Sequence, residues 1–200
     1  MAFEEFFNPD GIFAEDEVYV LRRLQEEDKE PFMQLLVDIS DIKDAYDNRD
    51  FYEYSWVSSL NDEEVLNLSL LERESGSYLG YLTVRDPYSE NPELGCDIVK
   101  EFRRKGIAYQ AIQLLIRRMK DLKGTRVFKI KAYVDNVASL NLIRKLGGVE
   151  VGREDNEFIS ILFKSREMIG GTLPEEDDGP NQEVIKEFAD RYFRVFEIRI

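Results

Sequence analysis

The stretch from residue 92 to residue 147 constrains the fold more than any other part of the chain. It reads as a strand, a glycine-containing loop, a long amphipathic helix, a second strand and a second helix. Two strands joined by a helical crossover are expected to be parallel, whereas the other strands follow one another as antiparallel neighbours. The sequence therefore predicts an α/β fold built on a mixed sheet.

Three cations stand directly before a glycine, at the point where the long helix is expected to begin. Arg103, Arg104 and Lys105 precede Gly106, which lacks a Cβ and so lets its backbone approach a ligand closely. The unpaired N–H groups and the dipole of a helix N-terminus favour bound anions. The pattern predicts a phosphate-binding loop. The alternative, a solvated basic helix surface, accounts for the later cations of the helix better than for these three.

The charge distribution supports an anion site. The chain has a net charge of −14, yet residues 92 to 147 hold 13 Lys and Arg against 5 Asp and Glu. Residues 1 to 91 hold 7 against 23. A chain with a pI near 4.6 and one compact basic region is an unlikely partner for nucleic acid. The acidic flanks instead favour a cationic partner.

Length and composition predict one globular domain spanning residues 1 to 200, with no linker long enough to divide it. No apolar run approaches the roughly 18 residues of a membrane span, and the N-terminus does not resemble a signal peptide. The single cysteine, Cys96, suits a reducing compartment. We expect a cytoplasmic protein without a membrane contact.

The absence of histidine removes several chemistries. Neither a Ser-His-Asp triad nor a Cys-His dyad can be built, and a zinc site of the Cys/His kind is excluded, so no metal is expected. Acid–base work falls to Asp, Glu, Tyr, Lys, water or the substrate.

Hydrophobic periodicity places the remaining elements. Strands are expected at residues 18–24, 65–72, 78–85, 93–99, 127–134, 149–151, 158–163 and 194–200, and helices at 32–39, 107–122, from 136 and at 184–193. Residues 1 to 16 are expected to pack over the first strand, and 168 to 182 to form a loop with an acidic segment at 174 to 179. The aromatic residues between 46 and 56 fit either a core or the wall of an apolar pocket.

Two groups of residues match a known family. The pattern Arg103-x-x-Gly106-x-Ala108, followed by Asn136-x-x-Ser139 and by Lys145-x-Gly147, resembles the GNAT N-acetyltransferases over residues 92 to 148. The opening Leu21-Arg22-x-Leu24-x-x-x-Asp28 is similar to the branch that acetylates ribosomal-protein N-termini. This resemblance implies a mostly antiparallel sheet flanked by helices, with its two parallel strands, the fourth and fifth predicted, splayed apart.

The resemblance also implies acetyl-CoA as donor and a primary amine as acceptor. The loop would hold the pyrophosphate, the end of the strand at 93–99 would pair with pantetheine, and Asn136 would contact the cofactor arm. The cofactor-binding residues implied in this way are Ile98, Val99, Arg103, Arg104, Lys105, Gly106, Ile107, Ala108 and Asn136.

The catalytic residues depart from the family pattern. Ile143 stands where many members carry a tyrosine that protonates the leaving thiolate. Ser139 is the residue expected to donate this proton instead. The alternative is that Ser139, in its Asn-x-x-Ser pattern, only caps its helix. Lys131 stands where some members carry a glutamate. Glu93 matches the strand glutamate that histone-type members use as a base, although an exposed edge carboxylate is the alternative interpretation.

Three functions remain open from the sequence. The first is an N-acetyltransferase for a cationic amine such as a protein N-terminus, a polyamine or an aminoglycoside-like compound. The second is a non-catalytic CoA-binding sensory module, and the third an interaction domain for an acidic partner. A homodimer is left open.

Overall fold

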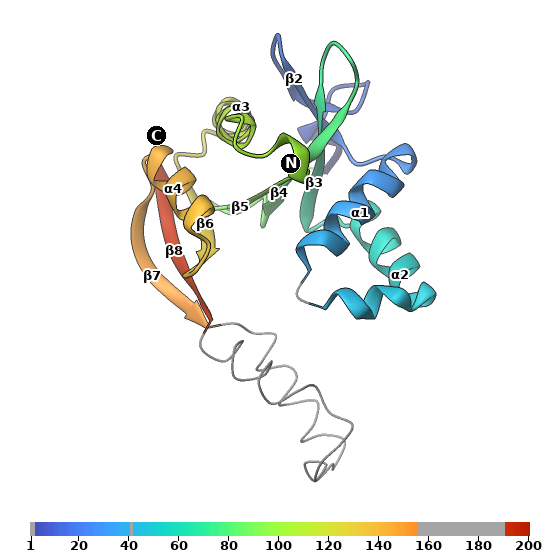
Figure 1. Cartoon of the computed structure of the whole chain (residues 1–200). Helices are drawn as coiled ribbons and strands as arrows, with labels where there is room; N and C mark the ends of the chain where they lie inside the picture. The colour runs from blue at the N-terminus through green and yellow to red at the C-terminus, as the bar shows by residue number, and fades with distance from the viewer. Residues whose placement is uncertain (1–2, 41, 156–190) are drawn as a thin grey trace, which may run out of the picture. The chain divides into compact units, whose positions relative to one another are not determined.

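The computed structural model describes residues 3–40, 42–155 and 191–200 (Figure 1). The chain divides into two compact units, Met1–Lys129 with Ile198–Ile200 and Ile130–Glu197. The strands are hydrogen-bonded in the order β1-β2-β3-β4-β5-β6-β8-β7. The fold is a mixed α/β fold with a mostly antiparallel sheet in which β5 and β6 are parallel, as predicted. The splay of that pair stays a prediction.

The bounds of the regular elements agree closely with the sequence prediction between residues 65 and 145. The strands are β1 (Ile12–Glu15), β2 (Tyr19–Arg23), β3 (Val65–Glu72), β4 (Tyr78–Arg85), β5 (Glu93–Ile98), β6 (Val127–Tyr133), β7 (Val149–Asp155) and β8 (Tyr192–Arg199). The helices are α1 (Lys29–Ile39), α2 (Arg49–Leu60), α3 (Ile107–Lys123) and α4 (Val137–Lys145).

Strands β1 to β5 of the first unit form one antiparallel series. Residues 1 to 16 were expected only to pack over a strand, but they contain β1, which pairs with β2. The turn before β1 could have indicated this strand. In that turn, Asn8 Oδ1 accepts hydrogen bonds from the N–H groups of Asp10 and Ile12. A four-residue strand is too short to show a clear period of two.

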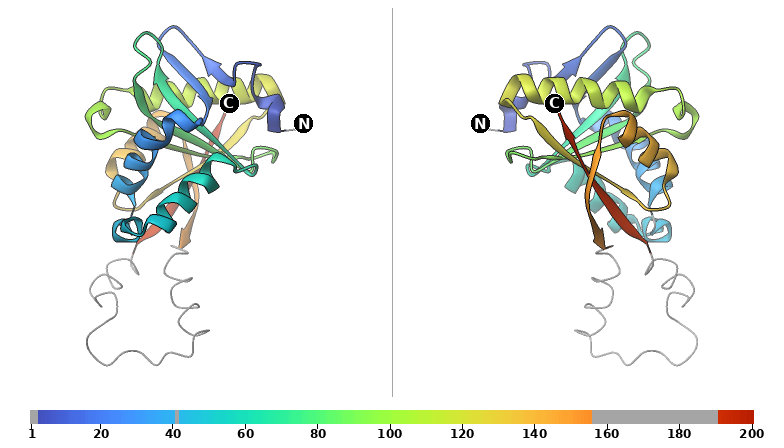
Figure 2. Two further views of the ribbon diagram at one scale, coloured as in Figure 1. Left: turned by 90° about the vertical axis from the view of Figure 1, so that its right-hand side faces the viewer. Right: turned by 90° about the vertical axis from the view of Figure 1, so that its left-hand side faces the viewer.

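Helix α3 lies on one face of this sheet, and α1 and α2 lie on the other (Figures 1 and 2). The β3 residues Leu66, Leu68 and Leu70 are fully buried. The buried side of α3 includes Ile112, Leu115 and Met119 at helical spacing, so the predicted apolar side of this helix is confirmed.

On the opposite face, α1 and α2 pack around Phe32. Its ring lies 5.8 Å from the ring of Trp56 and 4.8 Å from that of Tyr81 on β4. The sequence prediction did not include α2, because its residues are aromatic-rich rather than periodic. Asn48 begins this helix by accepting hydrogen bonds on its side chain from two backbone N–H groups. Trp56 is core, whereas Tyr54 is 70% exposed.

A buried carboxylate fixes the turn between β2 and α1. Asp28 is 4% exposed and binds both terminal nitrogens of Arg22, at 2.7 and 2.8 Å. It also accepts hydrogen bonds from the Ser69 hydroxyl at 2.6 Å and from the Gln25 N–H at 3.0 Å. Three of these bonds end on Oδ2 and one on Oδ1, so both carboxylate oxygens are hydrogen-bonded. This ion pair explains why Arg22 and Asp28 occur together in the sequence.

Replacing Asp28 with Asn should lower the free energy of unfolding by about 2 kcal/mol, because an amide cannot accept both Arg22 nitrogens and leaves a mostly buried guanidinium poorly paired. Urea denaturation measures the change. The matched control is Glu4→Gln, since Glu4 pairs with Arg23 at 2.8 Å but is 75% exposed. An equal decrease in the free energy of unfolding in both variants would show that the burial of Asp28 adds nothing to the stability from its ion pair.

The second unit holds the greater part of β6 together with α4, β7 and β8. Strands β7 and β8 are antiparallel, and the rings of Tyr133 and Phe193 stack at 4.0 Å. Because residue 191 is not helical and β8 begins at Tyr192, the helix predicted to reach residue 193 is wrong for its last three residues. The predictions for residues 158–163, 168–182 and 174–179, and the rest of that helix, lie outside the described residues. Among the helices that are described, none is long and apolar enough to cross a membrane.

Candidate active site

The loop between β5 and α3 has two backbone positions in the left-handed region. Arg104 has φ 63° and Gly106 has φ 83°. A left-handed conformation is costly for a side chain such as that of Arg104, and strain of this kind gathers at ligand-binding sites. Alternating backbone conformations turn successive N–H groups towards one concave side, where an anion can bind.

Gly106 leaves open space beside the start of α3. A Cβ built on it would meet nothing within 4 Å, so its conformation and not the packing of the protein requires glycine. The first hydrogen bond of the helix runs from the Gln110 N–H to the Gly106 carbonyl, at 3.2 Å. The N–H groups of Ile107 and Ala108 precede that bond and have no partner within the helix. The helix N-terminus therefore offers backbone donors at these two positions.

The three cations of the loop have different surroundings. Arg104 and Lys105 are exposed, with the Lys105 ammonium 5.2 Å from the ring centre of Phe102. Arg103 donates from Nε to the carbonyl of Ile98 at 2.7 Å, which ties the loop to the end of β5. Arg103 therefore braces the loop.

The end of β5 is held closely against β4. The Val99 N–H donates to the Leu79 carbonyl at 3.0 Å, and the Val99 carbonyl accepts from the Phe102 N–H at 2.9 Å. Gly80 lies opposite Ile98, and a Cβ on Gly80 would stand 2.1 Å from the backbone oxygen of Asp97. The pairing of Ile98 and Val99 with pantetheine stays a prediction.

Glu93 lies at the other end of β5 from the loop. The regular register between β4 and β5 puts Glu93 and Asp97 on the same face of the sheet, as predicted. At about 3.3 Å per residue the two are roughly 13 Å apart along the strand. The Glu93 side chain is 20% exposed and lies 3.8 Å from Arg85 Nε.

Asp97 is the more deeply placed carboxylate of the two. Burial raises its pKa, while a hydrogen bond from Tyr81 and the charge of Arg103 act in the opposite direction. Burial also raises the pKa of Tyr81 and of the neighbouring Cys96 thiol, each further raised by the Asp97 charge. The thiol is therefore a poor nucleophile.

The predicted residues of the second unit lie at the start of α4. The Asn136 side chain accepts a hydrogen bond from the Ser139 N–H at 3.0 Å, so Asn136 is the N-cap of this helix. Ile143 is 1% exposed and belongs to the core. Lys131 pairs with Glu154 at 3.2 Å.

The model of the acetyltransferase (GNAT) domain family matches residues 19–149 of the chain. The chain belongs to the GNAT acetyltransferase family. No curated protein matches the sequence significantly.

Solved structures show the same GNAT fold at low sequence identity. RimL, the ribosomal L7/L12 alpha-N-protein acetyltransferase, has a TM-score of 0.60 at 16% identity, over 94% of this chain and 98% of RimL. The microcin C7 self-immunity acetyltransferase MccE, in complex with acetyl-CoA and AMP, has a TM-score of 0.63 at 18% identity over 97% and 98%. A chimera of spermidine N-acetyltransferase SpeG from Vibrio cholerae and hSSAT has 0.63 at 14% over 90% and 95%.

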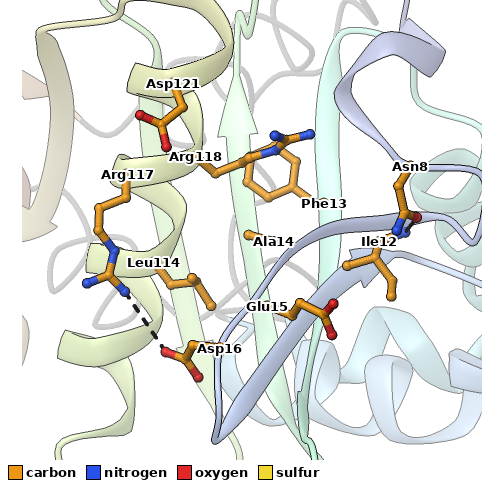
Figure 3. A pocket seen from close by; sticks show the side chains of 10 residues that line it. All are labelled: Asn8, Ile12, Phe13, Ala14, Glu15, Asp16, Leu114, Arg117, Arg118 and Asp121. Carbon is orange, nitrogen blue, oxygen red and sulfur yellow. Dashed lines mark hydrogen bonds and ion pairs between the residues drawn. The ribbon is translucent and has the colours of Figure 1, made fainter.

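The first unit of this GNAT chain also has a groove of about 460 Å³ between β1 and α3 (Figure 3). Arg117 points towards Asp16 at 3.9 Å, and Arg118 extends over Phe13 with a buried Nε that has no hydrogen-bond partner among the described residues. Cationic and anionic side chains both line the groove, so it selects no single class of ligand. Within the described residues, no cluster of three His, Cys, Asp or Glu side chains could hold a metal ion.

Proposed function

We propose that this GNAT protein transfers the acetyl group of acetyl-CoA to a cationic primary amine. The observation that carries the proposal is the loop before α3, where left-handed Arg104 and Gly106 precede the backbone N–H donors of Ile107 and Ala108 at the helix N-terminus. Such a loop fits a pyrophosphate, because it combines backbone donors, open space beside Gly106 and two exposed cations.

The residues around the loop support the proposed binding of acetyl-CoA. The backbone of residues 104 to 108 would hold the pyrophosphate, with Arg103 bracing the loop, and Ile98 and Val99 would pair with the pantetheine arm. Asn136 would contact the same arm through its side-chain nitrogen, since its oxygen caps α4. Acetyl-CoA supplies an activated thioester, so the protein's task is to position an amine and to receive its proton.

The acceptor is proposed to be cationic because acidic side chains dominate residues 1 to 91. The face of β5 that carries Glu93 and Asp97 adds two carboxylates. Peptide N-termini and polyamines belong to this class, and the names of RimL and SpeG show that the same fold serves both. Glu93 and Asp97 are the two candidates for the base, and Ser139 stays the predicted proton donor to the thiolate.

The rival function is a CoA-binding module without catalysis, which the buried Ile143 in place of a tyrosine favours. Isothermal titration with acetyl-CoA and an assay of thiol release over a panel of amines separate the two. Binding together with amine-dependent thiol release supports the acetyltransferase. Binding without release for any amine supports the rival, and absence of binding contradicts both.

The affinity for the acceptor should fall with ionic strength. Between about 0.05 and about 0.5 M salt, we expect KM for a diamine to rise roughly fivefold and KM for the monoamine of equal chain length to rise less, because salt screens the attraction between charges. Steady-state kinetics at saturating acetyl-CoA measure both. A KM independent of salt, or a preference for an anionic amine, would contradict a cationic acceptor.

A further inference from the structure

A row of polar residues crosses the first unit from β2 to β5. Arg22 lies opposite Ser69, Ser69 opposite Tyr81, and Tyr81 opposite Asp97. Residues directly opposite one another in a sheet project from the same face. This is the face of α1 and α2, because Tyr81 belongs to the apolar cluster around Phe32. Because these side chains lie between the sheet and the helices, each of their polar groups needs a hydrogen-bond partner.

The β2 end of the row is complete. The Asp28 carboxylate binds both terminal nitrogens of Arg22, the Ser69 hydroxyl and the Gln25 N–H. Its charge is paired and both of its oxygens are hydrogen-bonded within the protein. Its Arg22–Asp28 ion pair is structural.

The β5 end of the row is incomplete. The Asp97 carboxylate has the Tyr81 hydroxyl as hydrogen-bond donor and the charge of Arg103 nearby. The Tyr78 hydroxyl is buried and has no hydrogen-bond partner among the described residues. Tyr78 packs against the same apolar cluster as Tyr81, so its side chain lies on the face of the row. Burial, then the charge of Asp28, with a contribution from that of Asp97, raises the pKa of its hydroxyl. A buried hydroxyl without a partner destabilises a protein, so it is expected where a ligand completes the site.

A primary ammonium group would supply the hydrogen-bond donors and the positive charge that this end of the row lacks. It brings three N–H donors to a site with two acceptors, the Asp97 carboxylate and the Tyr78 hydroxyl oxygen. An anion would meet the Asp97 charge, and an apolar group would leave the hydroxyl unsatisfied. The site is therefore suited to the charged form of an amine.

We propose that Asp97, with Tyr78 beside it and Tyr81 orienting it, binds the ammonium group of the acceptor and takes its proton. This inference rests on the proposed function. Asp97 receives one proton from the ammonium, and the freed electron pair of nitrogen forms the bond to the acetyl carbon. The bond from that carbon to sulfur breaks, and the sulfur leaves with its electron pair and takes the second proton that nitrogen loses. Charge and atoms balance without a further reactant.

The environment of Asp97 suits a base. Because burial raises its pKa, Asp97 stays protonated to a higher pH than an exposed aspartate, and activity should rise as pH increases through that raised pKa. The titratable and charged groups that interact with it are Tyr81 and Tyr78 on β4 and Arg103 from the loop, while Cys96, next to it in the strand, projects from the other face. Glu93 faces Arg85 instead.

The kinetic test uses the full chain with Asp97→Asn, Glu93→Gln and the exposed control Glu63→Gln. We expect Asp97→Asn to lower kcat/KM at neutral pH by roughly 100-fold or more and to remove the rise of activity with pH that Asp97 causes, while acetyl-CoA affinity is unchanged. At high pH the rate should recover in part, because free amine is then abundant.

Tyr78→Phe should raise KM more than it lowers kcat. A wild-type rate and pH profile in Asp97→Asn, or the whole loss in Glu93→Gln instead, overturns the assignment.

A binding test does not depend on turnover. In the presence of CoA, butylammonium should shift the NMR signals of the Tyr78 ring in the wild type and in Glu63→Gln, but not in Asp97→Asn. Tyr78→Phe assigns the signal. Butylammonium that leaves the Tyr78 ring unaffected in the wild type overturns the ammonium site, even if the protein acetylates amines. A protein that binds butylammonium here but releases no thiol with any amine retains the site and loses the proposed function.

Discussion

Replacing Gly106 with valine should weaken acetyl-CoA binding by roughly 100-fold or more. Gly106 has φ 83°, and the space beside it is empty in the protein. A β-branched side chain is strained in this conformation and would fill the space through which a pyrophosphate reaches the N–H groups of α3. Isothermal titration with acetyl-CoA measures the effect. Gly106→Ala should give a smaller loss in the same direction.

The same helix supplies a matched control. Gly124 ends α3 with φ 69° and also has nothing within 4 Å of a Cβ built on it. Gly124→Val should therefore cost a comparable amount of stability, measured by urea denaturation, without changing the affinity for acetyl-CoA. If both variants bind as the wild type does, or if both lose affinity equally, Gly106 is not at the cofactor site.

Replacing Gly80 with alanine should lower the free energy of unfolding by about 4 kcal/mol, near the upper end for a single substitution. The added Cβ would stand 2.1 Å from the Asp97 carbonyl oxygen and 3.0 Å from the Ile98 Cα, both backbone atoms that cannot rotate away. Gly80 has φ 154°, which adds strain for any L residue. Strands β4 and β5 would have to separate where the candidate site begins.

Gly152→Ala is the control, because Gly152 also lies in a strand but has open space around its Cα. It should change stability by less than about 0.5 kcal/mol. Urea denaturation, followed by circular dichroism, compares the two. A Gly80→Ala protein as stable as Gly152→Ala would mean that β4 and β5 do not approach as closely as described.

The sequence predicted the fold best where hydrophobic periodicity was long and turn residues were distinct. The strands at 65–72 and 78–85 agree to the residue, and α3 begins at Ile107 as expected. Helix α2 was missed because its aromatic residues serve both the core and the surface, so no single apolar side is visible. Strand β1 was missed because four residues cannot establish a pattern.

The candidate site was predictable only in its local part. The cation-rich loop and Gly106 are contiguous in the sequence, so their chemistry could be inferred before the fold was known. The row from Arg22 to Asp97 joins four strands whose register no single segment encodes. Tyr78 could not be identified as a site residue from the sequence, because tyrosines are common in strands. Only the structure shows that its hydroxyl is buried without a hydrogen-bond partner among the described residues.

Hydrogen exchange at the start of α3 is expected to show whether a ligand occupies the loop. The amides of Ile107 and Ala108 precede the first bond of the helix and have no acceptor within it. We expect their hydrogens to exchange with deuterium faster than those of the next turns, which exchange only when the helix opens. An anion bound to the loop should slow exchange at these two positions and leave the middle of α3 unchanged. Mass spectrometry of one short peptide thus detects occupancy by any ligand, without a label and without turnover.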